Sequence, residues 1–393
     1  MSRPQYLLPV IVFSQFCGTS LWFAANAVLV DLQQDWGLAQ DSPGHITIAV
    51  QLGFILGTFL FALLVIADRF SPRLVFFVSS IVAALATASL LVIPQLPSAL
   101  LLSRFVSGFF LAGIYPVGMK IAAGWFQRDL GRALGFLVGA LVLGTAFPHL
   151  LRASGAQLPW QAVIVSVSVL AVIGAGAMLL LVPDGPYMTR GSGFTPRALT
   201  ILLHSKRLRA SACGYFGHMW ELYALWAFLP LWLIAYSQRN AVELNPYWWT
   251  FAIIAIGFFG CAIGGAISMR AGSARVAAVQ LAISGICCLI SPLFFNGDSL
   301  LLLLFLLLWG ITVAGDSPQF SALNAKYAPP EYVGSVLTLV NCIGFLVTVF
   351  SIQLLDALLG IIPVDFLFWL LIPGPVLGLW MMRGLRDSRP DTA

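Results

Sequence analysis

Residues 108–116 read GFFLAGIYP and residues 310–318 read GITVAGDSP, so both stretches share the pattern Gly-x-x-x-Ala-Gly-x-x-Pro. The second copy begins 202 residues after the first (310 minus 108). The loops after the two copies also end in similar sequences, GRAL at 131–134 and GSVL at 334–337. Self-similarity at a nearly fixed offset is the signature of duplicated structural units. The sequence therefore predicts two homologous halves, and glycines spaced in this way predict closely packed helices.

The composition identifies the class of protein. Hydrophobic residues make up 60% of the 393 positions, and charged residues only 9%. A soluble domain usually carries about 25% charge, so this chain lacks the polar side chains to cover its own surface. We therefore exclude a soluble globular enzyme, a disordered protein and a nucleic-acid-binding module. Motifs for a nucleotide, a zinc ion or a c-type haem are missing, so we expect no cofactor and no resident metal.

The apolar stretches predict the fold. A helix needs roughly 20 apolar residues to cross a bilayer, and a helix satisfies its own backbone polar groups in lipid. Twelve stretches qualify: 7–30, 45–67, 74–94, 98–123, 132–151, 161–183, 210–236, 247–269, 276–295, 299–324, 333–358 and 362–382. The predicted fold is an all-α membrane protein with twelve transmembrane helices in two pseudo-symmetric six-helix bundles. Its parts are a first bundle at 1–183, a central loop at 184–209, and a second bundle with a short tail at 210–393.

Lys and Arg set the expected orientation, because cytoplasmic loops carry an excess of both. With both termini in the cytoplasm, sixteen of these residues lie in cytoplasmic segments, and two, Arg152 and Arg239, lie in outer loops. We interpret the net charge of +5 as a topology signal rather than as a nucleic-acid or lipid patch. The expected location is the plasma membrane, as a multi-pass protein of a bacterial inner membrane. The N-terminal segment resembles a signal peptide that we expect to remain uncleaved.

A motif follows the second predicted helix. Residues 64–73 read LVIADRFSPR, which resembles the signature G-x-L-A-D-R-x-G-R-R of the major facilitator superfamily. The match covers Asp68, Arg69 and Arg73, whereas the glycines differ. The second half keeps Arg270 at the matching place. The R-x-x-x-G signature of the fourth span fits Arg104 and the glycine that opens the repeat.

The resemblance covers nearly the whole chain and implies a twelve-helix transporter that works by alternating access, usually as a monomer. It implies that Asp68, Arg69, Arg73 and Arg270 form a conformational latch on the cytoplasmic side. Within the superfamily, the chain is most similar to the nitrate/nitrite and cyanate porter branch, through GIYP at 113–116 and GHMWELYA at 217–224. The glycine-dense signature of nitrate porters is absent from the expected spans, so nitrate is not assigned.

Few ionisable side chains lie inside the predicted spans. Each costs about 2.5–3.5 kcal/mol on insertion scales and therefore invites a functional explanation. Glu221 lies near the middle of its span with His218 one turn away on the same face, and Asp316 stands where the first repeat copy has Ile114. We expect Glu221, His218, Asp316 and Arg104 to serve proton coupling. The structural alternatives are a static pair for Glu221 and His218, a helix-end ion pair for Asp316, and snorkelling for Arg104.

A second set of residues is expected to bind substrate. Lys120 is a candidate anion ligand, with snorkelling to the cytoplasmic surface as its alternative. The resemblance implies that spans 1, 4, 7 and 10 line the cavity, which favours polar and aromatic side chains there. The expected substrate-binding residues are Trp22, Asn26, Tyr115, Lys120, Trp220, Tyr223 and Asn341. Ordinary packing is the alternative for the aromatic members.

Three functions remain open. The first is proton-coupled uptake of a small anion, in which Arg104 and Lys120 meet the substrate. The second is proton-driven efflux of an amphipathic or cationic compound that Glu221 and Asp316 bind directly. The third is transport of a metal ion or metal chelate, suggested by the His218-x-x-Glu221 pair.

An enzyme is not expected, because the sequence has no HExxH or Gly-x-Ser-x-Gly string. A GxxxxGK[ST] string is also missing, so ATP-driven transport is unsupported. The expected partners are a small-molecule substrate, protons and the lipid bilayer, and not nucleic acid.

Overall fold

The structure is a computed structural model that describes residues 4–37, 42–126, 130–154, 158–188 and 193–385. These residues are helical apart from turns, bends, short irregular connections and one isolated bridge between Leu359 and Ile362, which confirms the predicted all-α class. Eleven helices in the described part are long and apolar enough to cross a membrane, and Leu7–Thr19 is a shorter apolar helix. Five arginines used to predict the orientation lie outside the described residues, namely Arg3, Arg128, Arg190, Arg386 and Arg389.

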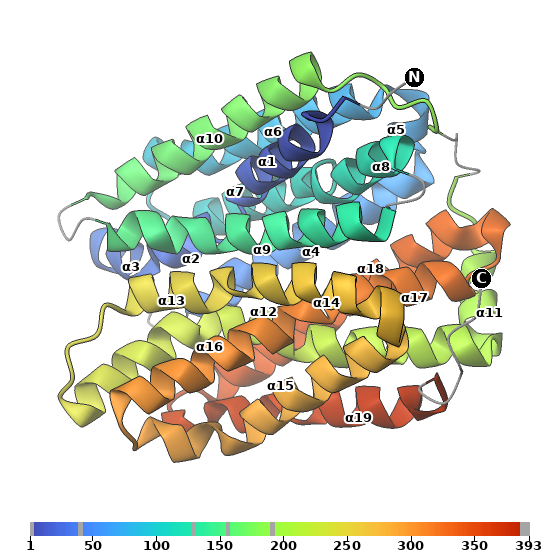
Figure 1. Cartoon of the computed structure of the whole chain (residues 1–393). Coiled ribbons are helices and arrows are strands. Elements are labelled where there is room, and N and C mark those ends of the chain that lie inside the picture. The colour runs from blue at the N-terminus through green and yellow to red at the C-terminus, as the bar shows by residue number, and fades with distance from the viewer. Residues whose placement is uncertain (1–3, 38–41, 127–129, 155–157, 189–192, 386–393) are drawn as a thin grey trace. The chain divides into compact units, whose positions relative to one another are not determined.

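The chain divides into two compact units, unit 1 at Met1–Phe194 and unit 2 at Thr195–Ala393. Their boundary falls inside the polar stretch at 184–209. Unit 1 contains α1 (Leu7–Thr19), α2 (Ala24–Ala27), α3 (Leu29–Trp36), α4 (Ser42–Leu63), α5 (Ile66–Arg69), α6 (Pro72–Ala88), η1 (Ser89–Leu91), α7 (Pro97–Leu111), α8 (Tyr115–Trp125), α9 (Leu130–Ala153) and α10 (Trp160–Leu181). Within this unit, α4 packs along α7, and α10 packs against both α1 and α6 (Figure 1).

Unit 2 contains α11 (Arg197–His204), α12 (Lys206–Asn240), α13 (Pro246–Ala255), α14 (Gly257–Ala271), α15 (Ser273–Phe295), α16 (Ser299–Gly315), α17 (Ser317–Tyr327), η2 (Pro330–Tyr332), α18 (Val333–Leu358), η3 (Val364–Leu371), α19 (Pro373–Met382) and η4 (Arg383–Leu385). The long helix α12 packs against α18 and α19, and α15 packs against α16 and α17 (Figure 1). This arrangement places α12, α15 and the junction of α16 with α17 around one polar interior.

The repeated glycines make the same contact in both units. Gly108 on α7 lies against the carbonyl of Val50 on α4, and Gly310 on α16 lies against the carbonyl of Ile253 on α13. A Cβ atom at either glycine would overlap a carbonyl oxygen. The two helix backbones therefore touch at equivalent places, which is the close packing that the spacing predicts.

Both repeat copies also interrupt their span. The helix α7 ends at Leu111 and α8 begins at Tyr115, whereas α16 ends at Gly315 and α17 begins at Ser317. In each case a proline stands in the first turn of the second helix, where its missing N–H has no consequence for the helix. Ile114 is the N-cap residue of α8, and Asp316 is the N-cap residue of α17. The duplicated break thus carries an apolar residue in unit 1 and an acid in unit 2.

The first predicted span, 7–30, is not one continuous helix. A turn at residues 20–23 separates α1 from α2. Within it, the carbonyl groups of Leu21 and Trp22 accept hydrogen bonds from the Arg104 guanidinium on α7, at 2.7 and 3.1 Å. Backbone carbonyl groups where a helix ends lack hydrogen-bond donors within that helix. Here the Arg104 guanidinium is the donor for the carbonyl groups of Leu21 and Trp22. The break in span 1 therefore depends on a residue of span 4.

Candidate functional site

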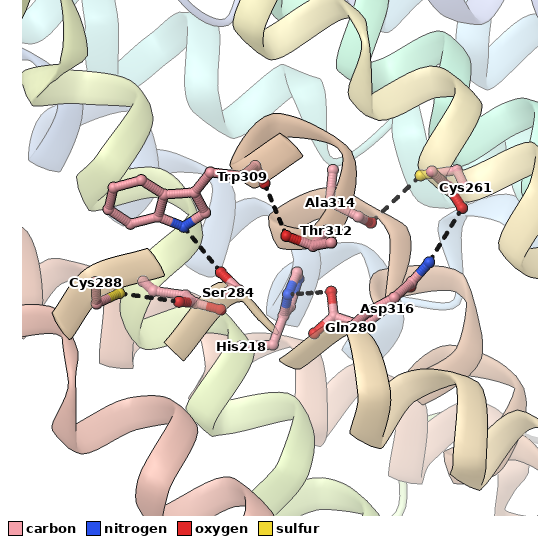
Figure 2. Close-up of polar contacts among 11 residues, drawn as sticks. His218, Cys261, Gln280, Ser284, Cys288, Trp309, Thr312, Ala314 and Asp316 are labelled. Atoms are coloured by element: carbon pink, nitrogen blue, oxygen red, sulfur yellow. Dashed lines mark hydrogen bonds and ion pairs between the residues drawn. The ribbon is translucent and has the colours of Figure 1, made fainter. Parts of the chain in front are cut away.

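Unit 2 contains a cluster of buried polar side chains beside the break between α16 and α17 (Figure 2). His218 on α12 lies with its Nδ1 atom 2.8 Å from Asp316 Oδ1, and both side chains are fully buried. Glu221, one turn further along α12, is fully buried as well. The fold thus brings together three of the four residues predicted to serve proton coupling.

The Asp316 carboxylate sits where one helix ends and the next begins. Asp316 is the C-cap residue of α16 and the N-cap residue of α17. Its backbone carbonyl accepts hydrogen bonds from the N–H groups of Gln319 and Phe320, at 3.0 and 3.1 Å, which start α17. The start of a helix carries partial positive charge and favours a negative group. The break that the repeat introduces therefore stabilises an acid in the middle of the span.

Two aromatic rings flank the imidazole of His218. The ring centroids of Tyr215 and Phe320 lie 5.9 and 6.1 Å from the imidazole centroid. The Tyr215 hydroxyl donates a hydrogen bond to Asn341 Oδ1 at 3.1 Å, so this ring is itself fixed by α18. These contacts restrict the imidazole and keep its Nδ1 atom directed at Asp316.

Glu221 makes its contacts with α15. Cys288 Sγ donates a hydrogen bond to Glu221 Oε2 at 3.5 Å, and the Ser284 hydroxyl lies beside the same carboxyl group. Ser284 also accepts a hydrogen bond from Trp309 Nε1 at 3.0 Å (Figure 2). Since its oxygen is already an acceptor for the indole, the hydroxyl proton of Ser284 is available to the Glu221 carboxyl.

The sequence interpretation missed the residues contributed by α15. Gln280, Ser284 and Cys288 are spaced by four, so they share one face of the helix. Gln280 Nε2 donates to the Gly260 carbonyl at 3.5 Å and therefore ties α15 to α14. This polar face within an otherwise apolar span was the signal that would have identified them.

The cluster has an unusual balance of charge. It holds two fully buried carboxyl groups, those of Glu221 and Asp316. Among the described residues, no Lys or Arg side chain forms an ion pair with either carboxyl group. In the same part of the chain, His218 Nε2 and Glu221 Oε1 have no protein hydrogen-bond partner. Two acids and one imidazole with unfilled donor and acceptor positions have the chemistry needed to bind and release a proton.

A metal site has less support from this geometry. The described residues include no group of three His, Cys, Asp or Glu side chains arranged to hold a metal ion. The two side chains of the His218-x-x-Glu221 pair make different contacts: His218 faces Asp316, and Glu221 faces Cys288.

The buried cation of unit 1 is part of the helix framework. Arg104 is fully buried, so the snorkelling alternative does not describe it. Besides the two carbonyl groups in span 1, its Nη1 atom donates to Thr87 Oγ1 at 3.2 Å. Its guanidinium thereby joins α7 to the span 1 turn and to α6.

Lys120 and three of the predicted latch residues, Asp68, Arg69 and Arg73, lie at one end of unit 1, whereas Arg270 belongs to unit 2. Lys120 Nζ is 2.5 Å from Asp68 Oδ1 and 2.9 Å from the Ala67 carbonyl oxygen. Arg73 Nε lies 3.6 Å from Asp184 Oδ1, which also accepts a hydrogen bond from Ser71 Oγ at 2.9 Å. Arg69 and Arg270 are exposed. The structure thus brings Asp68 to Lys120, a residue that the sequence interpretation placed in the substrate site.

Apart from Lys120, which is partly exposed, the expected substrate-binding residues of unit 1 are buried. Asn26 Nδ2 donates to Thr47 Oγ1 at 2.7 Å, and the Trp22 ring packs on Phe54 with centroids 4.9 Å apart. Tyr115 is buried at the start of α8. Their role in substrate binding stays a prediction.

The corresponding residues of unit 2 lie along α12 and α18. Trp220 Nε1 donates to the Leu370 carbonyl at 3.0 Å. The Tyr223 ring packs against Phe345 and Trp226, with centroids 5.3 and 5.4 Å apart. Asn341 accepts the hydrogen bond from Tyr215 already described. Their role also stays a prediction.

Comparison with known proteins relates the chain to transporters. The family model for the Major Facilitator Superfamily matches residues 11–352. A chloramphenicol resistance protein of Streptomyces lividans is 28% identical over 281 residues, which cover 69% of this chain and 68% of that protein. The niacin transporter NiaP of Acinetobacter baylyi is 32% identical over 132 residues, which cover 31% of this chain and only 29% of the transporter.

Solved structures share the fold at low sequence identity. The human organic anion transporter MFSD10 superposes with a TM-score of 0.76 at 17% identity, covering 97% of this chain and all of that one. The proton:xylose symporter XylE superposes with a TM-score of 0.74 at 13% identity, covering 97% and 96% of the two chains. The family match over most of the chain, together with its many apolar helices, identifies this multi-pass membrane protein as a transporter, and not an enzyme, of the Major Facilitator Superfamily.

Proposed function

We propose that this protein is a proton-coupled secondary transporter whose proton-binding site is the cluster of Glu221, His218 and Asp316. The observation that carries the proposal is the complete burial of two carboxyl groups in one cluster, in which the imidazole of His218 is the basic partner that the described residues supply. A buried carboxylate is costly to keep charged, so a proton bound in the cluster removes that cost and its release restores it. The occupancy of this site therefore changes the charge inside unit 2 in each transport cycle.

The coupling follows from where the cluster lies. Asp316 joins α16 to α17, and His218 and Glu221 lie on α12. The resemblance noted above implies that these spans face the substrate cavity. A change of charge at their junction gives the inward-open and outward-open conformations different stability, which is the requirement for a ligand to drive a conformational change. Under this proposal the bundles at 1–183 and 210–383 alternate access around the substrate.

The substrate class that fits best is an amphipathic organic compound that moves outward in exchange for protons entering down their gradient. The two cations predicted to meet a small anion, Arg104 and Lys120, are engaged by protein acceptors. Aromatic side chains make up much of the predicted substrate set. The similarity to a chloramphenicol resistance protein over more than two thirds of both chains supports the same class.

Uptake of a small organic anion is the second candidate. It is supported by the segment that resembles a niacin transporter. For this candidate, Arg104 or Lys120 has to exchange a protein acceptor for the substrate carboxylate. We place the protein in the plasma membrane of a bacterium with both termini in the cytoplasm, in agreement with the distribution of Lys and Arg.

The test uses purified protein in liposomes that contain a pH-sensitive dye. Chloramphenicol and niacin serve as probes, the first a neutral amphipathic compound and the second a carboxylate. We expect the parent protein to move protons when chloramphenicol is added, and Glu221→Gln to reduce that proton flux about tenfold or more. Glu243→Gln, which changes an exposed acid of the same unit, is the matched control and should behave as the parent.

Two outcomes would change the proposal. Substrate-driven proton flux of normal size in Glu221→Gln would remove the cluster from coupling. Proton flux that responds to niacin and not to chloramphenicol would replace efflux with anion uptake while leaving the proton site in place.

A further inference from the structure

The segment that precedes α12 has features that the transport cycle does not use. The helix α11 (Arg197–His204) is eight residues long and belongs to unit 2, where it packs against α18 and α12. Residues 195–210 contain Arg197, Lys206, Arg207 and Arg209 and no acidic residue. All four of these cationic side chains are exposed.

The helix has three distinct sides. Ala198 and Leu202, four residues apart, are buried against the unit. Leu199 and Leu203, also four apart, are 48% and 54% exposed. Thr200 and His204 occupy the remaining side and are exposed as well. An apolar strip therefore runs along α11 next to the side that the protein covers.

The position of α11 decides what covers the strip. Only Ser205 separates it from α12, whose 35 residues span about 52 Å, more than the roughly 30 Å of a hydrocarbon core. Helix α12 therefore extends beyond the core, and its first turn, which carries Lys206, Arg207 and Arg209, is the end that favours the level of the headgroups over the acyl chains. A helix at that level with leucines on one side and cations beside them lies in the membrane surface.

We propose that α11 and the basic residues that follow it form a binding surface for anionic phospholipid headgroups. Leu199 and Leu203 enter the acyl chains next to the headgroups, and Arg197, Lys206 and Arg207 pair with the lipid phosphates. The Arg209 guanidinium is held by the Leu203 carbonyl at 2.6 Å, which joins the end of α11 to the start of α12. The sequence interpretation read these cations as a topology signal alone, and the exposed leucines beside them are the observation that adds a lipid site.

The first experiment measures lipid stabilisation of the purified protein in detergent. Phosphatidylglycerol should raise the Tm of the parent more than phosphatidylcholine does, because a ligand of the native state stabilises it. Lys206→Gln combined with Arg207→Gln should lose more than half of the difference between the two lipids. The control pair, Arg270→Gln with Arg275→Gln, changes two exposed arginines, one in the last turn of α14 and one in the first turn of α15, and should keep the difference. An equal loss in both pairs, or no loss in the first, would overturn the assignment.

The second experiment locates the leucine strip. A fluorescent thiol label is placed at Leu203→Cys or at Thr200→Cys, and the protein is reconstituted into an equimolar mixture of phosphatidylcholine and phosphatidylglycerol. Lipids brominated on the acyl chains should quench the label at 203 at least twice as strongly as the label at 200. Equal quenching would mean that the strip faces water or another protein, and it would refute the membrane assignment. The unsubstituted chain, with its six native cysteines, gives the labelling background.

Discussion

His218 Nδ1 lies 2.8 Å from Asp316 Oδ1 at the break in the tenth span, where the equivalent break in the first half carries Ile114. The same helix geometry thus serves two purposes. In unit 1 the break is apolar, and a buried charge elsewhere in that unit, Arg104, holds the backbone turn of span 1. In unit 2 the break presents an acid to a histidine. The duplication supplied the architecture, and the difference at one position gives unit 2 an ionisable centre.

The contact between His218 and Asp316 should appear as energetic coupling. We expect His218→Gln and Asp316→Asn each to reduce the free energy of unfolding by about 2 kcal/mol, because each leaves a buried polar partner unsatisfied. The double variant should be less destabilised than the sum of the two by about 1 kcal/mol. Chemical unfolding in detergent, followed by tryptophan fluorescence, measures this. Additive losses would mean that the two side chains do not interact in the folded protein.

The role of Arg104 can be separated from proton transfer by a conservative change. Lysine keeps the positive charge but has no planar fork, so Arg104→Lys loses at least one of the hydrogen bonds to Leu21, Trp22 and Thr87. We expect a loss of about 2 kcal/mol in the free energy of unfolding. Arg275→Lys, at an exposed position, is the control. A variant that unfolds like the parent but no longer moves protons would instead make Arg104 a proton relay.

The sequence predicted the architecture because its signals are local or repeated. Apolar stretches identify the spans, and the Gly-x-x-x-Ala-Gly-x-x-Pro strings identify equivalent places in the two halves. It also identified Glu221, His218 and Asp316 individually, since an ionisable side chain in an apolar stretch stands out by itself. These signals need no knowledge of which helices are neighbours.

The sequence did not predict which side chains of different helices contact each other. The spacing of His218 and Glu221 predicted that the two interact with each other, whereas the contacts in the structure join His218 to Asp316 and Glu221 to Cys288. The alternative expected for Asp316 was a helix-end ion pair, whereas its partner in the structure is His218 on another helix. Such pairings depend on how α12, α15 and α16 pack, and apolar helix faces of similar composition do not encode a unique neighbour. For the same reason the break in span 1 was missed, because its stabilising residue lies in span 4.

The close approach of α13 and α16 predicts different effects for two glycines of unit 2. Gly310→Ala places a Cβ atom on the Ile253 carbonyl, so the helices must move apart, and we expect a loss of about 1–3 kcal/mol in stability. Gly265→Ala on α14 meets no atom within 4 Å and should be neutral or stabilise by about 0.5 kcal/mol. Thermal unfolding of the two variants side by side provides the comparison. Equal behaviour would show that the repeat glycine is not needed for packing.

The pairing of Lys120 with Asp68 makes a prediction that distinguishes a latch from a substrate site. If the pair stabilises one conformation of the transporter, Lys120→Gln and Asp68→Asn should slow transport by the same factor, about threefold to fivefold, because a partly exposed pair contributes up to about 1 kcal/mol. The double variant should be no slower than either single variant, and substrate affinity should stay unchanged. Transport rates in liposomes and equilibrium binding in detergent give the two quantities. A loss of affinity confined to Lys120→Gln would return Lys120 to the substrate site, where the sequence first placed it, and would favour an anionic substrate.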